Sequence, residues 1–195
     1  MPVKCNYRSS RNYFKNGTMN KKLTLLLLCS FHFIVAQGNQ EIVKKAYEIQ
    51  TKWGFKAKNK NIITLIDFSK SIEEARLYVV DLKNSKILLE SNVDHGSGSG
   101  TGLTPNLFSN IEGSNATSLG CYVTLQTYKG TWGYSLRLNG LEDDKNSNAL
   151  KRNIVVHSSK RMYSKFSLGC FSVPDKNANM LIDLIKNGSL VYAYQ

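Results

Sequence analysis

Short apolar segments recur along residues 62–194, and this recurrence limits the fold more than any other feature of the sequence. Most of the segments alternate apolar with polar residues or are rich in β-branched residues, and polar turn residues separate them, which is typical of strands. The segments are Ile62–Asp67, Arg76–Leu82, Lys86–Val93, Cys121–Leu125, Tyr134–Leu138, Asn153–Val156, Phe171–Val173 and Ser189–Tyr194. About eight short strands predict one mainly β domain, a β-sandwich or a barrel.

Two further segments, 40–53 and 175–187, carry apolar residues at helical spacing. These residues are Ile42, Ala46, Ile49 and Trp53 in the first segment, and Ala178, Leu181, Ile182 and Ile185 in the second. Asp175 is the predicted N-cap of the second helix and Gly188 its C-cap. Ser71–Glu74 matches a capping box and predicts a single helical turn. The helices are therefore expected at the periphery of the sheet.

The N-terminal region resembles a targeting segment. Lys21 and Lys22 precede the uncharged run Leu23–Ala36, which is shorter than the roughly 20 residues that a membrane-spanning helix needs. A secretory signal in residues 1–36 is the prediction, with Met19 as the true start; an uncleaved anchor or a buried helix are the alternatives. We therefore expect an exported protein, periplasmic or in the cell envelope, that meets the membrane only through this segment.

Three parts follow from these patterns. They are a signal region (1–36), an N-terminal helix with a basic connector (37–61), and the strand-rich domain (62–195). The formal net charge of +12 is inflated by the signal region, which holds six of the 26 Lys and Arg residues and no acidic residue. The remainder is mildly basic, which suits an anionic polymer. Nucleic acid is not the expected partner, because no recognition motif is present.

Two cysteines, Cys121 and Cys170, lie outside the signal region. In an exported protein they could form a disulfide, or one could be a nucleophile and the other a buried residue. Cys121 alternates with Val123 and Leu125, which favours burial. The cysteines and histidines show no metal-ligand spacing, so no metal and no cofactor is expected.

The second cysteine belongs to a pattern that carries chemistry. Val155-Val156-His157-Ser158 brings a histidine to the end of a strand, and Ser167-Leu168-Gly169-Cys170 then leads into the next strand. Attack by a thiolate needs a nearby base for the thiol proton. A glycine before the cysteine allows a sharp turn whose backbone amides could stabilise an oxyanion. His157 and Cys170 are thus the candidate catalytic pair, with Ser167 and Gly169 shaping the turn.

This pattern resembles the active-site motif of the YkuD-type L,D-transpeptidases, in the branch where a bulky residue precedes Gly-Cys. The resemblance covers about residues 62–174. Other segments that resemble this branch are Asp67–Lys70, Arg76–Leu82, His95-Gly96, Phe108–Ser114, Ser118–Gly120, Tyr128–Gly130 and Ser135–Glu142. What it implies is a YkuD-like β-sandwich or barrel with peripheral helices, acting as a monomer on peptidoglycan stem peptides.

The resemblance also implies a reaction. Cys170 would attack the carbonyl between the third stem residue and D-Ala, with His157 as base and either the side chain or the carbonyl of Ser158 orienting the ring. An amine from a neighbouring stem would then resolve the thioester into a 3–3 cross-link. Two alternatives remain: water as acceptor, giving an L,D-carboxypeptidase, and a non-catalytic wall-binding module.

The sequence departs from the family pattern at the substrate-binding positions. Leu168 replaces a histidine, and no arginine follows Cys170. Arg137, Arg161 and Lys165 are therefore the candidates for binding a substrate carboxylate, with a solvated loop as the alternative for the last two.

A glycine-rich segment, residues 95–102, begins with His95 and fits neither a Walker A loop nor a dinucleotide fingerprint. We expect a flexible loop near the cleft. His95 then lies either close to the substrate or in a structural position. Trp132 and Tyr134 could stack on glycan rings, but packing is the simpler interpretation.

Overall fold

A computed structural model describes the backbone of residues 21–159 and 167–195, and the side chains of residues 37–159 and 167–195. The chain divides into two units, residues 1–37 and 38–195. In the first unit the described residues form the beginning of helix α1 (Lys21–Trp53). Met19, the predicted start, lies outside the described residues. None of the helices described combines the length and the apolar character that crossing a membrane requires.

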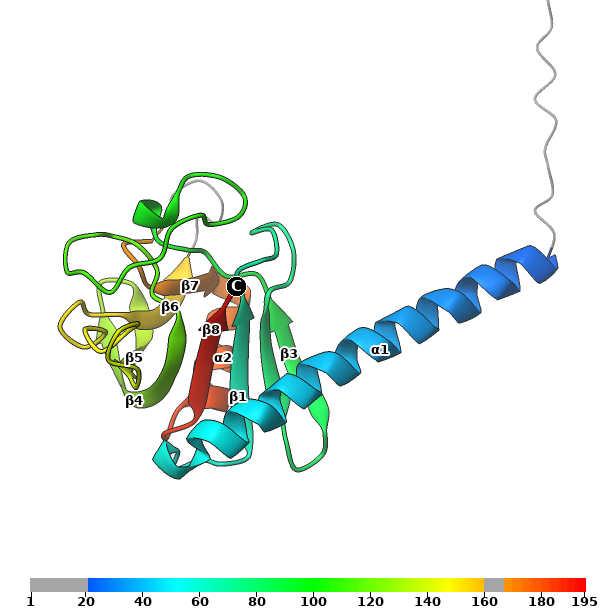
Figure 1. Ribbon diagram of the computed structural model, residues 1–195, viewed down its shortest axis with the longest axis horizontal. Helices are drawn as coiled ribbons and strands as arrows, with labels where there is room; N and C mark the ends of the chain where they lie inside the picture. Colours follow the sequence, from blue (N-terminus) through cyan, green and yellow to red (C-terminus); the bar gives the residue numbers. More distant parts are fainter. Residues whose placement is uncertain (1–20, 160–166) are drawn as a thin grey trace, which may run out of the picture. The chain divides into compact units, whose positions relative to one another are not determined.

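Eight strands form one curled, barrel-like sheet in the second unit (Figure 1). The strands are β1 (Ile62–Asp67), β2 (Leu77–Asp81), β3 (Lys86–Ser91), β4 (Gly120–Gly130), β5 (Gly133–Gly140), β6 (Val155–Ser159), β7 (Phe171–Pro174) and β8 (Leu190–Tyr194). Their order in the sheet is β3-β2-β1-β8-β4-β5-β6-β7. The prediction of a mainly β, barrel-like domain with peripheral helices is confirmed.

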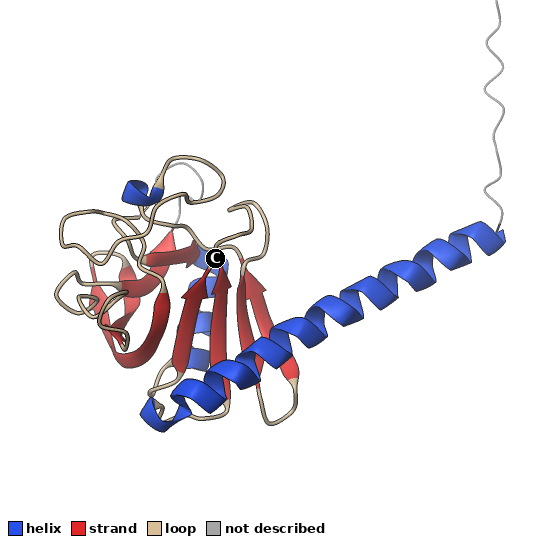
Figure 2. Cartoon of the chain, in the orientation of Figure 1, coloured by secondary structure: helices blue, strands red, loops and turns tan. Residues whose placement is uncertain are grey.

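Strand β1 is buried on both faces, which explains why four of its six residues, on both faces, are apolar. Ile66 belongs to the main hydrophobic cluster, between the sheet and helix α2 (Asp175–Ile185). Ile63 and Leu65 belong to a second cluster, which Ala46 of α1 helps to form. Figure 2 shows α2 behind the strands. The sheet is thus held by a helix on each face.

Helix α2 buries its predicted face but ends differently from the prediction. Pro174, which closes β7, occupies the N-cap position, and no side chain caps the helix. Asp175 is therefore the first residue of the helix and not its cap. At the other end the C-cap is Lys186 and not the predicted Gly188, because the helix already ends at Ile185. Gly188 lies two residues further on, with φ +82°.

The capping box at Ser71 forms its hydrogen bonds without a helix. The backbone N–H of Ser71 donates to Glu74 Oε2 at 3.0 Å, and the N–H of Glu73 donates to Ser71 Oγ at 3.2 Å. The predicted helical turn is instead a hydrogen-bonded turn, because the chain enters β2 directly afterwards, at Leu77.

The glycine-rich segment is packed and is not the free loop that the sequence led us to expect. It contains a short 3-10 helix, η2 (Ser97–Ser99), and its backbone is bonded to distant segments. The N–H of Gly96 donates to Thr117 Oγ1 at 2.8 Å, and that of Ser97 to the carbonyl of Ser167 at 2.7 Å. An isolated bridge pairs Gly96 with Ser167. These bonds connect the segment to the turn that precedes β7.

Candidate active site

Strands β6 and β7 are parallel neighbours, and their register places the candidate pair. Val156 pairs with Phe171 and His157 with Ser172. Val156 and Phe171 face the main cluster, so His157 faces the opposite side because side chains alternate along a strand. Cys170, one residue before Phe171, lies on the same side as His157. Both residues line one cavity of about 890 Å³. The structure brings the two predicted residues together.

His157 is held as a neutral imidazole. Its Nδ1 lies 2.8 Å from the carbonyl oxygen of Ser158, which can only accept, so Nδ1 carries the proton and Nε2 keeps its lone pair. Burial lowers the pKa of His157. Of the two alternatives for Ser158, the structure has the carbonyl orienting the ring; the hydroxyl donates to the carbonyl of Trp132 at 3.4 Å.

Cys170 is a free thiol in a partly exposed position. Its Sγ lies 3.5 Å from the carbonyl oxygen of Asn153. Burial raises the pKa of the Cys170 thiol, while a backbone hydrogen bond and the charge of Arg152 act in the opposite direction. The resting thiol therefore keeps its proton near neutral pH, and a base has to remove it before attack.

The turn before Cys170 depends on a glycine. Gly169 has φ +107°, and a Cβ at this position would lie 2.8 Å from the carbonyl oxygen of Ala116. Ser167 Oγ donates to the carbonyl of Cys170 at 2.6 Å and accepts from the N–H of Gly169 at 3.2 Å. The two predicted turn residues thus hold the backbone on either side of the cysteine.

Cys121 lies in β4, away from this cavity. Its side chain is fully buried, and burial raises the pKa of its thiol to about 12. It is free, like Cys170, so the alternative of a disulfide between them is not observed. Burial as a small apolar residue is confirmed.

Of the three candidate substrate-binding cations, only Arg137 lies within the described residues. Arg137 lies over the ring of Tyr128, 4.5 Å from its centroid, and does not line the cavity. Arg161 and Lys165 lie outside the described residues. His95 is fully buried, with Nδ1 3.0 Å from Arg76 Nη2 and Nε2 3.1 Å from the carbonyl oxygen of Gly100. Of the two positions expected for His95, close to the substrate or structural, the structure has the structural one.

Sequence reasoning missed other residues of the cavity wall. Arg152 and Asn153 border it just before β6, and Asp175 and Asn179 border it from α2. Trp132, for which the sequence left stacking or packing open, also lines the cavity, at the tip of the β4–β5 hairpin. Arg152 could have been noticed as the last cation before the histidine strand, but nothing local distinguishes it from a solvated loop residue.

Comparison with known proteins places this geometry in a family. The family model described as the L,D-transpeptidase catalytic domain matches residues 36–194. The chain belongs to this family. Membership agrees with the sheet and with a histidine and a cysteine that face one cavity. No curated protein matches the chain.

Solved structures, among them two of L,D-transpeptidases, resemble the chain at low identity. An L,D-transpeptidase from Mycobacterium smegmatis is 12% identical, with a TM-score of 0.45, over 69% of this chain and 59% of that one. One from Stackebrandtia nassauensis is 14% identical, with a TM-score of 0.47, over 71% and 58%. The cell shape determining protein Pgp2 from Campylobacter jejuni is 15% identical, with a TM-score of 0.49, over 69% and 47%. The chain thus spans about six-tenths or less of these structures.

Proposed function

We propose that this member of the L,D-transpeptidase family is a cysteine acyltransferase that forms 3–3 cross-links between peptidoglycan stem peptides. The observation that carries the proposal is the placement of His157 and Cys170 on one side of two adjacent parallel strands, lining one cavity. The fixed tautomer of His157 supports it further, because the lone pair on Nε2 is the acceptor that a thiol proton needs.

The first half-reaction transfers the stem peptide to the enzyme. In the resting site the thiol lies against the carbonyl of Asn153, so it exchanges this acceptor for His157 Nε2 as substrate binds. His157 takes the proton, and Sγ attacks the carbonyl carbon between the third stem residue and D-Ala. The backbone N–H of Cys170 is the proposed donor to the resulting oxyanion. The C–N bond then breaks, the imidazolium gives its proton to the leaving amine, and D-Ala departs from a thioester.

The second half-reaction releases the peptide. The amine of a neighbouring stem attacks the thioester carbonyl and loses a proton to His157, and the thiol of Cys170 leaves as it regains that proton. A new amide bond forms and the free enzyme returns. Water in place of the amine yields a tripeptide acid, which is the carboxypeptidase alternative.

We also propose the organisation predicted from the sequence. Residues 1–36 act as a signal that exports the protein to the periplasm or cell envelope, residues 37–61 form the helix and connector, and residues 62–195 form the catalytic domain of a monomer. The apolar run after Lys21 and Lys22 supports this proposal.

Intact-mass measurement on reduced protein mixed with a disaccharide-tetrapeptide tests the reaction. We expect an adduct equal to the muropeptide without D-Ala, absent in Cys170→Ala and retained in Cys121→Ala, whose thiol is buried. Cross-linked dimers identify transfer, and tripeptides identify hydrolysis. A folded protein that forms neither an adduct nor a product with this donor would overturn the proposal in favour of a wall-binding module.

A further inference from the structure

Arg152 connects the cysteine site to a distant loop. Its Nη1 donates to the carbonyl of Ser109 at 2.7 Å and to Ser118 Oγ at 2.6 Å. Its Nη2 donates to the carbonyl of Ala116 and, at 3.4 Å, to Ser114 Oγ. The acceptors all belong to residues 109–118. One side chain, placed just before β6, thus holds both ends and the middle of this loop.

The same guanidinium lies against the turn that carries the nucleophile. A Cβ at Gly169 would be 3.0 Å from Arg152 Nη2, and Arg152 and Cys170 line the same cavity. The side chain therefore contacts the loop on one side and the residue before Cys170 on the other. The absence of a side chain at Gly169 lets the guanidinium approach the backbone this closely.

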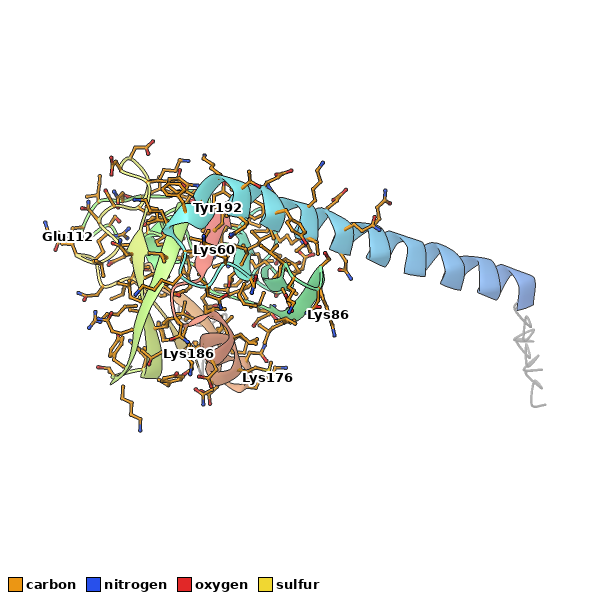
Figure 3. All side chains as sticks on the ribbon, turned by 90° about the horizontal axis from the view of Figure 1, so that it is seen from below. Lys60, Lys86, Glu112, Lys176, Lys186 and Tyr192 are labelled. Atoms are coloured by element: carbon orange, nitrogen blue, oxygen red, sulfur yellow. The ribbon has the colours of Figure 1, made fainter. Side chains whose placement is uncertain are left out.

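The charge of Arg152 is not balanced by a carboxylate. Its four hydrogen-bond acceptors are neutral, and no ion pair involves it within the residues that the structure describes. Its neighbour Lys151 differs, because it is 70% exposed and pairs with Glu112 at 2.8 Å. Figure 3 shows Glu112 at the edge of the domain. Of the two adjacent cations, Lys151 thus binds the loop on its solvent side and Arg152 binds it on its buried side.

Holding a partly buried cation without a counter-ion is unfavourable unless negative charge develops nearby. Burial lowers the pKa of Arg152, but a guanidinium stays protonated at neutral pH. Two groups beside it could carry negative charge, Tyr122 and Cys170. Burial raises the pKa of Tyr122 well above its ordinary value, so the phenol stays neutral and the Cys170 thiolate is the charge that can form. The interaction is mutual, because the charge of Arg152 lowers the pKa of Cys170 against the effect of burial.

We propose that Arg152 is a positioning residue of the cysteine site, which fixes the loop 109–118 beneath the nucleophile turn and stabilises the Cys170 thiolate by its charge. The inference rests on Cys170 being the nucleophile of the proposed function. It assigns the loop 109–118 a role in catalysis. The cation that it identifies is different from the three that the sequence predicted for binding a substrate carboxylate.

The rate of iodoacetamide alkylation at Cys170, followed on its peptide by mass spectrometry as pH is varied, tests the charge. We expect Arg152→Gln to be alkylated about three- to tenfold more slowly at pH 7, with the midpoint of its pH profile displaced upward. Arg152→Lys restores most of the rate because it keeps the charge. Lys151→Gln, which removes the same charge from the adjacent residue, leaves the rate unchanged. The measurement needs no peptidoglycan, so it can fail or succeed independently of the acyl-transfer assay.

Two results would overturn the charge effect: a folded Arg152→Gln with the wild-type profile, or Arg152→Lys as slow as Arg152→Gln. If Arg152→Gln does not fold by circular dichroism, Arg152→Lys and Ser118→Ala carry the test, since both retain the cation. The alkylation rates of both variants should then stay within about twofold of the wild-type rate, and a larger loss in either contradicts the proposal.

Proteolysis within residues 109–118 tests whether Arg152 fixes this loop. Arg152→Lys should be cut faster than Lys151→Gln, and equal rates would show that the loop does not depend on Arg152.

Discussion

The ring of Trp132 stacks on the ring of His157, with centroids 5.3 Å apart and planes at 24°. Trp132 is 62% exposed, so it contributes little to the core of the domain. It lies at the tip of the β4–β5 hairpin, and its carbonyl accepts the hydroxyl of Ser158, the residue whose own carbonyl orients His157. The hairpin tip thus covers the proposed base and keeps water from one face of its ring.

Removing the indole of Trp132 should change the pH profile of activity more than it changes the stability of the fold. Because burial lowers the pKa of His157, the acid limb of kcat/KM should lie below pH 6.5, the ordinary value for histidine. We expect Trp132→Ala to move that limb towards 6.5 and to lower kcat/KM about tenfold, with a Tm within a few degrees of the wild type. Trp132→Phe keeps a stacking ring and serves as the control. D-Ala release between pH 4.5 and 8 gives the profiles; an unmoved acid limb in Trp132→Ala would show that the indole does not shield the base.

Gly169 should not tolerate a side chain. Its φ is +107° and an added Cβ meets the carbonyl oxygen of Ala116 at 2.8 Å, so Gly169→Ala combines backbone strain with a clash. Gly113 also has a positive φ, +77°, but has open space around it, so Gly113→Ala isolates the strain. We expect Gly113→Ala to lower the free energy of unfolding by about 1 kcal/mol and to stay active. Gly169→Ala should lose more stability and nearly all activity. Urea denaturation and D-Ala release measure the two effects, and equal losses in both variants would contradict the steric argument.

His95 should make the fold sensitive to acid. Burial, together with the charge of Arg76, lowers its pKa from 6.5 to about 4. Between these values the unfolded chain binds a proton that the folded chain excludes, so stability is lost as pH falls through this window. The loss reaches about 3 kcal/mol at its lower end. Urea denaturation at pH 7, 5 and 4 measures it. His95→Gln should flatten this part of the dependence, and an unchanged slope would assign the acid sensitivity to other groups.

Thr124 connects the end of α2 to strand β4. Its buried Oγ1 donates to the carbonyl of Ile185 at 2.8 Å and accepts the N–H groups of Gly188 and Ser189 at 3.1 and 3.0 Å. Thr124→Val keeps the shape but leaves these groups unpaired, and should lower the free energy of unfolding by about 1–3 kcal/mol.

Thr64→Val provides the matched control for this prediction. The Thr64 hydroxyl is equally buried but has no hydrogen-bond partner among the described residues. The same substitution there should be neutral or stabilising, because only the desolvation of an unpaired hydroxyl is removed. Urea denaturation compares the two variants, and equal losses of stability would show that the hydrogen bonds of Thr124 contribute nothing beyond its shape.

Local sequence patterns predicted the strands and helices because the buried residues of this domain recur at the spacing of a strand or of a helix. Alternation identified β4 and β5, and the helical face from Ala178 to Ile185 identified α2. Where capping depends on a neighbouring strand, local patterns were wrong: Asp175 does not cap α2, and the box at Ser71 forms a turn only. In both places the adjoining strand determines the path of the chain.

The candidate pair was likewise accessible from sequence, because strand ends place His157 and Cys170 near each other without knowledge of the rest of the fold. The position of Arg137 was not, and Arg161 and Lys165 lie outside the described residues. Arg137 alternates with Leu136 and Leu138, which point into the main cluster, so it faces outwards over Tyr128. Arg152 acquires its contacts from residues 109–118, more than 30 positions earlier, and no local pattern reports a contact between such distant segments.

The packed segment after β3 has a consequence for how a peptide can approach the proposed nucleophile, Cys170. β7 is the last strand of the sheet, but its outer edge is already occupied: the N–H of Asp94 donates to the carbonyl of Ser172 at 2.8 Å, and Ser97 and Ser167 are bonded in the bridge beyond it. A peptide therefore cannot join the sheet there as an additional strand. A peptide substrate of the proposed reaction would instead enter over the face of the sheet and be recognised by side chains and by shape. Such a site does not impose the regular extended L-backbone of a β-ladder, so stereochemistry along the peptide is free to vary.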